Sequence, residues 1–185
     1  MMSMILNRLD SLRHKIQDPD FLCNRGLSNE VGIYIFAYHP EEEMAVRHFL
    51  SELKEKQQYP RILLYDLYDV LMDISKDRRI LDRIPSMEVQ RGSSFMMRQI
   101  QRVATPEAYI ERMKYQPHEH GDVVMISGIG RVYPYMRSHH ILNNLQHVFD
   151  DIPVVMLYPG EYTGQSLNLF SEFADDNYYR AFNLL

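Results

Sequence analysis

Residues 127–138 carry the glycines and basic side chains of an anion-binding turn. Glycine lets a backbone approach a ligand closely, a following helix start offers free N–H groups, and arginine can hold a phosphate or carboxylate through two hydrogen bonds. The alternative interpretation is that the glycines only make a turn and that the arginines are solvated or paired with acids. The candidate anion-binding residues are Gly128, Gly130, Arg131, Arg137 and His139.

The same stretch is not a nucleotide-binding P-loop. A P-loop contains Lys followed by Ser or Thr, which hold the phosphates and Mg²⁺, and that pair is missing here. The loop after the first apolar run is followed by three glutamates, residues 41–43, at the place where a phosphate-binding loop needs glycine and lysine. We therefore expect no intrinsic NTP hydrolysis and no bound cofactor.

Three further groups of side chains have the residue types of metal ligands. Asp66, Asp69 and Asp73 follow an apolar run and could hold Mg²⁺, but acids in a first helical turn also suit the helix dipole. His139 and His147 are two helical turns apart, which is too far for one ion without other partners. His118-Glu119-His120 does not have the His-Glu-x-x-His spacing. We assign no metal site to any of them.

A complete catalytic constellation is missing from the sequence. The single cysteine, Cys23, has no histidine partner near it in the sequence and is read as a small buried hydrophobe. A Gly-x-Ser-x-Gly nucleophile turn does not occur either. We therefore predict that the chain is not an enzyme; a degenerate, metal-dependent hydrolase that uses Asp66 or the histidines is the alternative.

The C-terminal quarter is rich in tyrosine and carries arginine and phenylalanine. Tyr and Arg are enriched among the residues that dominate protein–protein interfaces, although they also cover sheet edges well. The candidate partner-interface residues are Tyr162, Tyr178, Tyr179, Arg180 and Phe182.

Four apolar runs determine the expected fold. They cover residues 31–38, 61–65, 122–127 and 153–158, and each reads as a buried strand. Helical periodicity separates them, which is typical of a parallel sheet covered by helices. We predict an α/β three-layer sandwich with a mostly parallel central sheet, in a Rossmann-like or P-loop-like topology without a P-loop. Ligands of such sheets collect beyond the carboxyl ends of the strands.

Helical segments are predicted by apolar spacing and by start signals. One covers residues 5–16, one begins at Pro40, and one covers 138–149. The more polar stretch 76–117 holds two more, near 92–103 and 106–115, and reads as a helical insertion. Residues 159–185 are expected to form one helix and a final extended piece. The whole chain, residues 1–185, is expected to be one domain.

Bulk composition limits the location and the partners. The net charge is −5 with a pI of about 5.9, so nucleic-acid binding would need a local basic patch. A single cysteine suits a reducing compartment. The first ten residues do not form a signal peptide, and the chain has no uncharged apolar stretch long enough to span a membrane. We therefore expect a cytoplasmic protein that makes no membrane contact.

Several motifs together resemble the BrxB family. They are Gly128-x-Gly130-x-x-x-Pro134-x-x-Arg137-Ser138-His139, Pro153-Val154-Val155 followed by Tyr158-Pro159-Gly160-x-Tyr162, Asp176-Asn177-Tyr178-Tyr179-Arg180-Ala181-Phe182, and the early pattern Asp18-Pro19-Asp20-Phe21-Leu22. The resemblance covers nearly the whole chain; it is strongest from residue 122 onward and loosest over 76–117.

Membership implies a role in bacterial BREX phage defence. The resemblance implies that the chain works alongside an adenine methyltransferase, the AAA-type ATPase BrxC and the alkaline-phosphatase-like protein PglZ, and it implies no enzymatic activity. The leading hypothesis is a non-catalytic adaptor that docks PglZ or BrxC. The alternative is a module that senses phosphate or nucleic acid with residues 128–139; direct nucleic-acid binding is expected to be weak.

Overall fold

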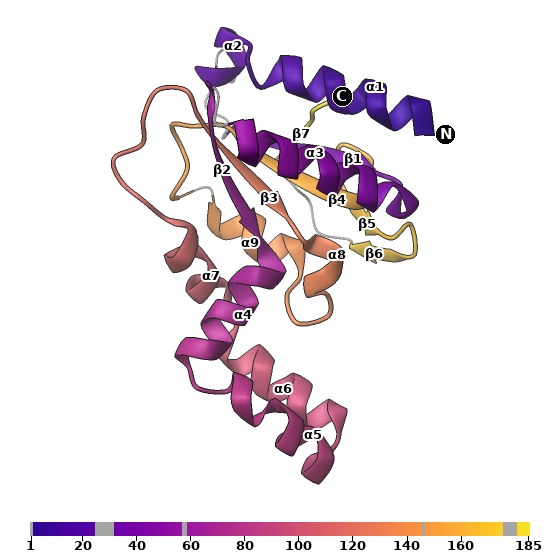
Figure 1. The fold of residues 1–185 in the computed structure, drawn as a ribbon, viewed down its shortest axis with the longest axis vertical. Helices are drawn as coiled ribbons and strands as arrows, with labels where there is room; N and C mark the ends of the chain where they lie inside the picture. The colour runs from indigo at the N-terminus through magenta and orange to yellow at the C-terminus, as the bar shows by residue number, and fades with distance from the viewer. Residues whose placement is uncertain (1, 25–31, 57–58, 146, 176–180) are drawn as a thin grey trace.

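A parallel sheet forms the centre of the molecule. The computed structural model describes residues 2–24, 32–56, 59–145, 147–175 and 181–185. Within them, the parallel strands have the order β2-β3-β4-β1-β7 (Figure 1). The strands are β1 (Ile33–Tyr38), β2 (Arg61–Asp66), β3 (Asp122–Ser127), β4 (Val154–Tyr162) and β7 (Phe182–Asn183). The predicted α/β class with a mostly parallel sheet is confirmed.

The strand order determines which strand ends become neighbours. β2 and β3 pair along their whole length, from Arg61 opposite Asp122 to Asp66 opposite Ser127. β1 lies between β4 and β7, so it is separated from β2 by two strands. In the dinucleotide-binding order 3-2-1-4-5-6, by contrast, the first two strands are adjacent. The carboxyl ends of β2 and β3 therefore form one corner, and those of β1 and β4 another.

Two helices cover one face of the sheet. They are α1 (Met2–Lys15) and α3 (Glu43–Lys56), which lie above the sheet in Figure 1. α1 buries the apolar stripe that its spacing predicted, and α3 buries Val46, Phe49 and Leu50. Both helices pack against alternate strand residues such as Phe36, Met125 and Leu157, because successive side chains of a strand point to opposite faces. The buried stripe of α1 and the loop that follows it is Ile5, Leu9, Leu12 and Ile16.

Start signals near the N-terminus act somewhat differently from the prediction. We expected the first helix over residues 5–16, and α1 ends at Lys15. Asp18 caps a second, short helix, α2 (Pro19–Leu22), by accepting a hydrogen bond from the Asp20 amide. Pro40 opens the 3₁₀ turn η1 (Pro40–Glu42) before α3, as predicted, and His39 and Glu42 form a reciprocal cap around it.

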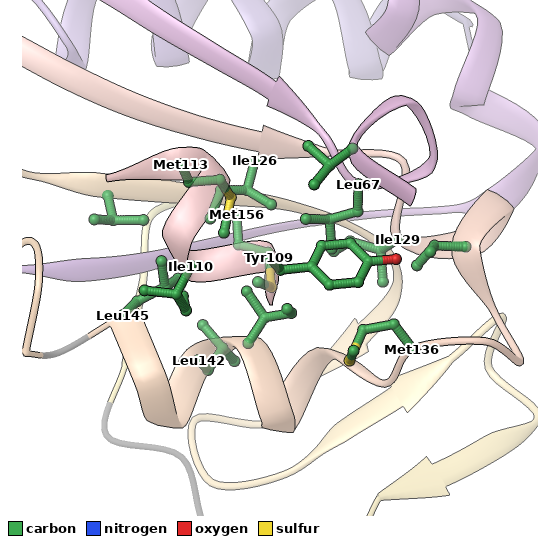
Figure 2. Packing of buried hydrophobic residues seen from close by; sticks show 14 of the residues in the cluster. Leu67, Tyr109, Ile110, Met113, Ile126, Ile129, Met136, Leu142, Leu145 and Met156 are labelled. Atoms are coloured by element: carbon green, nitrogen blue, oxygen red, sulfur yellow. The ribbon is translucent and has the colours of Figure 1, made fainter. Parts of the chain in front are cut away.

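The second face carries the larger core. It is covered by α4 (Leu67–Asp77), α7 (Pro106–Met113), α8 (Ile129–Val132) and α9 (Ser138–Leu145). Tyr109 of α7 is fully buried among Leu67, Ile126, Met136 and Leu142, as Figure 2 shows. Its hydroxyl has no hydrogen-bond partner among the described residues. Burial raises the pKa of this phenol, so the group stays neutral.

The connection from α4 to β3 is helical, and part of it lies away from the sheet. It contains η2 (Leu81–Arg83), α5 (Ile84–Arg91) and α6 (Ser93–Val103) before α7. The prediction placed helices near 92–103 and 106–115, which correspond to α6 and α7; α5 was not predicted. α5 has no buried residue and α6 has one, Ile100. This pair lies at the lower end of the molecule in Figure 1.

The C-terminal part forms strands instead of the predicted helix. β4 continues past Pro159 and pairs antiparallel with β5 (Leu167–Leu169), which pairs with β6 (Phe173–Asp175). Gly160 permits this hairpin: its φ is +154°, and a Cβ there would lie 2.1 Å from the Asn168 carbonyl oxygen. Residues 159–175 and 181–185 contain no helix, so the expectation of one helix was wrong in these ranges.

In the described ranges, no helix combines enough length and enough apolar character to span a membrane.

Candidate functional site

The carboxyl end of β2 is built around Asp66. Its side chain caps α4 by accepting hydrogen bonds from the amides of Tyr68, at 2.9 Å, and Asp69, at 3.3 Å. Ser127, opposite it at the end of β3, donates its hydroxyl to the second carboxylate oxygen at 3.3 Å. A carboxylate at a helix N-terminus is favoured by the helix dipole, so Asp66 has a local structural role before any ligand is considered.

Arg131 closes this corner. Its guanidinium donates to Asp66 Oδ1 at 2.7 Å and to Asp69 Oδ1 at 3.3 Å, and it lies 5.0 Å from the ring centroid of Tyr68. Burial pushes the pKa of Arg131 down, but the hydrogen bond and the charge of Asp66 outweigh it, so the pKa lies above its ordinary value. Of the two interpretations of Arg131, these contacts favour pairing with acids over holding a ligand.

The two glycines allow the chain to approach itself. Gly128 has a φ of +75°, and a Cβ there would lie 2.3 Å from Asp66 Oδ1. A Cβ on Gly130 would lie 2.7 Å from Cε1 of Phe170 in the C-terminal hairpin. The space that these glycines leave open is therefore filled by Asp66 and Phe170 of the same chain.

Arg137 and His139 lie apart from Arg131, at the start of α9. Arg137 is exposed, and its guanidinium lies 5.9 Å from the ring centroid of Tyr133. It borders a hollow of about 20 Å³ that is also lined by Tyr133, Ser138 and Tyr158, which is room for one water molecule. His139 is half-buried, with its ring 3.9 Å from that of His140. The five candidate anion-binding residues are therefore divided between two places.

The carboxyl end of β1 has the acidic character that the sequence predicted. Tyr38 is buried and donates its hydroxyl to Glu43 at 2.5 Å. Burial, and then the hydrogen bond to Glu43, raise the pKa of Tyr38 far above its ordinary range. His39 Nδ1 accepts a hydrogen bond from the Glu41 amide at 3.4 Å. Glu41 is exposed and the other two glutamates are half-buried, so the turn presents carboxylates where a phosphate-binding loop would present amides and lysine.

The candidate metal ligands all lie among the residues that the structure describes. No group of three or more His, Cys, Asp or Glu side chains there is arranged to hold an ion. Asp66 and Asp69 are engaged by Arg131, and Asp73 is exposed. His118 is hydrogen-bonded to Asp151, with its ring stacked 5.5 Å from Phe149.

The structure describes two of the five candidate interface residues, and both make contacts within the chain. Tyr162 is 9% exposed and donates its hydroxyl to the Ala181 carbonyl at 2.7 Å. Phe182 belongs to β7 and lies 5.8 Å from the ring of Tyr34. Both side chains hold the C-terminal segment on the sheet. Tyr178, Tyr179 and Arg180 lie outside the described residues.

One aromatic group was missed by the sequence analysis. Phe173 in the hairpin is 43% exposed, and its ring lies 5.2 Å from Tyr133 and 6.4 Å from Phe170. We call Tyr133, Phe170 and Phe173 the aromatic edge. Tyr133 belongs to the stretch 127–138 that holds the candidate anion-binding residues, and the phenylalanines belong to a segment that was predicted to be partly helical. Nothing in the sequence pattern therefore joined them.

Comparisons with known proteins identify the family. A family model described as "BREX protein BrxB" matches residues 63–184. A BREX protein BrxB from Bacillus cereus (strain H3081.97) is 39% identical over 190 residues, covering 100% of this chain and 99% of the relative. Another, from Escherichia coli O9:H4 (strain HS), is 28% identical over 180 residues, covering 96% and 90%.

No solved structure matches this chain. The family match covers well over half of the chain, and the Bacillus cereus relative aligns with all of it. The family that the sequence motifs suggested is therefore confirmed, and this chain belongs to the BrxB family of BREX phage-defence proteins.

Proposed function

We propose that this chain is a non-catalytic, cytoplasmic adaptor of a BREX complex that docks partner proteins such as PglZ or BrxC. The observation that carries the proposal is that the polar side chains at the carboxyl edge of the sheet are bound to one another. In open α/β sheets this edge is where ligands and reacting groups collect, yet here Asp66, Asp69, Ser127 and Arg131 bind one another. Nε of Arg131 is buried and has no hydrogen-bond partner among the described residues. Apart from this one donor, the corner has little left to offer a substrate.

The aromatic edge is a suitable docking surface. It joins an exposed phenylalanine to Tyr133, and the exposed Arg137 lies against the same tyrosine. Aromatic residues and arginine carry much of the energy in protein–protein interfaces, and they act best at the centre of a desolvated patch. Phe173 lies on strand β6, while Phe170 lies in the turn before it and Tyr133 directly follows α8. Tyr178, Tyr179 and Arg180 remain candidate anchors from the sequence.

Co-purification with each partner tests the proposal. The intact protein, tagged, is expected to retain PglZ or BrxC, and Phe173→Ala is expected to reduce the retained amount several-fold. Met44→Ala is the matched control, because Met44 is 71% exposed on α3 and lies outside the aromatic edge. A Tyr179→Ala/Arg180→Ala variant tests the second group of anchors. Full recovery of both partners by both folded test variants would contradict the adaptor role.

The alternative, a phosphate-sensing site in residues 128–139, has support at Arg137 only. This side chain is exposed beside the first turn of α9, whereas Arg131 is engaged by two carboxylates. Titration of the intact protein with inorganic phosphate, followed by NMR shifts of the 138–140 amides, tests it. Saturable shifts that Arg137→Ala abolishes would support the alternative, and their absence in the wild type would remove it.

A further inference from the structure

Positive charge is concentrated in one segment of this acidic chain. Residues 78–103 hold six arginines against two acids, Asp82 and Glu88, which gives a net charge of +4. The whole chain carries −5, so the remainder carries −9. We call residues 78–103 the arginine hairpin, since they contain η2, α5 and α6. Its arginines are Arg78, Arg79, Arg83, Arg91, Arg98 and Arg102.

These six arginines are available to a partner. Every one of them is exposed, and none forms an ion pair within the described part of the chain. Elsewhere in the described chain some arginines do pair with acids: Arg13 with Glu52, Arg61 with Asp122, and Arg112 with Asp77. Within the hairpin, the Glu88 carboxylate accepts the Ser93 hydroxyl at 2.7 Å. The positive charge of this segment is therefore not neutralised locally.

The outward face of α6 is polar and basic along its length. Ser94, Arg98 and Arg102 recur every four residues, and all three are exposed; that spacing places them on one side of a helix. Met96 and Ile100 face the other way, where they line an apolar cavity with Leu71 of α4. At the tip, Arg91 lies 4.8 Å from the ring of Phe95. An 11-residue helix is about 16 Å long, so the basic row is short and straight.

The position of the hairpin suits a large, charged partner. α5 has no buried residue, and the pair lies at the end of the molecule away from the sheet (Figure 1). Because charge effects in physiological salt fall off within about 8–10 Å, a partner that contacts the hairpin feels its +4 more strongly than the −9 of the body. A polyanion would be repelled from the body and would bind here in one orientation.

We propose that the arginine hairpin binds the phosphate backbone of a nucleic-acid duplex. Arginine guanidinium groups, serine hydroxyls and helix amides are the usual donors to DNA phosphates, and a helix fits the major groove, which is about 12 Å wide. Single-strand binders add exposed aromatic rings for base stacking, but Phe95 lies partly buried beside Arg91. This proposal is independent of the docking of protein partners at the aromatic edge.

Fluorescence anisotropy with a labelled, mixed-sequence DNA duplex and the full-length protein tests the proposal. The wild type is expected to bind with a dissociation constant in the range of about 10⁻⁴–10⁻⁶ M, weakening steeply between about 50 and 200 mM salt. Arg98→Ala/Arg102→Ala is expected to lower the affinity at least about tenfold and to reduce the salt slope by about two. Alanine keeps the helix, and circular dichroism checks the fold.

Two control variants make the test specific. Arg47→Ala/Lys54→Ala removes the same charge from exposed positions of α3 and is expected to change the affinity less than about twofold. Arg98→Lys/Arg102→Lys keeps the charge and is expected to keep the salt slope. No binding by the wild type at the lower salt concentration, or equal losses in the alanine and α3 variants, would overturn the proposal. Equal competition by poly-glutamate would assign the surface to an acidic protein instead.

Discussion

Arg61 and Asp122, the first residues of neighbouring strands β2 and β3, are joined by two parallel hydrogen bonds of 2.7 Å. Asp122 is 1% exposed and also accepts the Tyr115 hydroxyl at 2.6 Å and the Glu119 amide at 2.8 Å. This carboxylate therefore ties together two strands and the loop that leads into β3. It lies at the amino end of the sheet, opposite to the corner formed by Asp66.

Replacing this buried carboxylate should be costly. Asp122→Ala leaves the Tyr115 hydroxyl and the Glu119 amide without their acceptor, and we expect it to lower the free energy of unfolding by about 2–4 kcal/mol. Asp77→Ala is the matched control, because it breaks the ion pair between Asp77 and Arg112. The Asp77 side chain is 63% exposed, so this substitution should cost less than about 1 kcal/mol. Urea unfolding measures both values, and equal costs would contradict the prediction.

The same carboxylate should make stability depend on acid pH. Burial raises the pKa of Asp122, but the hydrogen bonds from Arg61, Tyr115 and the Glu119 amide outweigh it and lower the pKa from 3.8 to about 2. A depressed pKa in the folded state contributes stability above the unfolded value and loses it as the pH falls toward the folded value. Between about pH 4 and pH 2, the wild type should lose about 2 kcal/mol that Asp122→Asn does not lose. Parallel curves of unfolding free energy against pH would refute this.

Gly128 should resist substitution more than another glycine with positive φ. Gly128→Ala places a methyl group 2.3 Å from Asp66 Oδ1, whereas Gly164, at a φ of +89°, has nothing within 4 Å of its Cβ position. Both substitutions carry a backbone strain of about 1 kcal/mol or more. We expect Gly128→Ala to cost at least about 1 kcal/mol beyond Gly164→Ala in thermal or urea unfolding, because only the former displaces the Asp66 side chain. Similar losses of unfolding free energy in the two variants would contradict the prediction, because they would show that the Asp66 side chain can move aside at little cost.

Arg131 and Arg137 should differ in their contribution to stability. Arg131→Ala leaves Asp66 and Asp69 without their shared cation, so we expect a loss of about 1–3 kcal/mol. Arg137→Ala removes an exposed side chain and should stay within about 0.5 kcal/mol of the wild type. The two variants carry the same change of charge, so a comparison of their unfolding curves separates structural pairing from net charge. If Arg131→Ala leaves the free energy of unfolding unchanged, the pairing role is contradicted and Arg131 becomes a candidate for ligand binding again.

Tyr162 should hold the last strand in place. Tyr162→Phe removes the donor to the Ala181 carbonyl, and we expect a loss of about 0.5–1.5 kcal/mol. The Leu184 amide, which donates to the Ile35 carbonyl at 3.0 Å, should then exchange with solvent faster. Tyr59→Phe serves as the control, since Tyr59 is 63% exposed. Unchanged exchange at Leu184 would mean that other contacts hold β7.

The sequence by itself determined the parallel sheet, its main strands and most of its helices. The run 123–126 is apolar at successive positions, which is typical of a strand of a parallel sheet that is buried on both faces. Pro40 and the glutamates after it fixed the start of α3 because their preferences act within one helical turn. The hairpin after β4 escaped the prediction, since it depends on the approach of Gly160 to Asn168, which the tertiary structure brings about.

Only the tertiary structure decided what the polar residues do. Arg131 is 65 residues from Asp66, and Arg61 is 61 residues from Asp122, so no local pattern could pair them. Strand order placed these ends side by side, and a charge that loses water to burial is retained only where an opposite charge meets it. The six arginines of residues 78–103 are exposed because their helices project from the body, so their charges stay in water and need no opposite charge. No carboxylate of the described chain comes within ion-pairing distance of them.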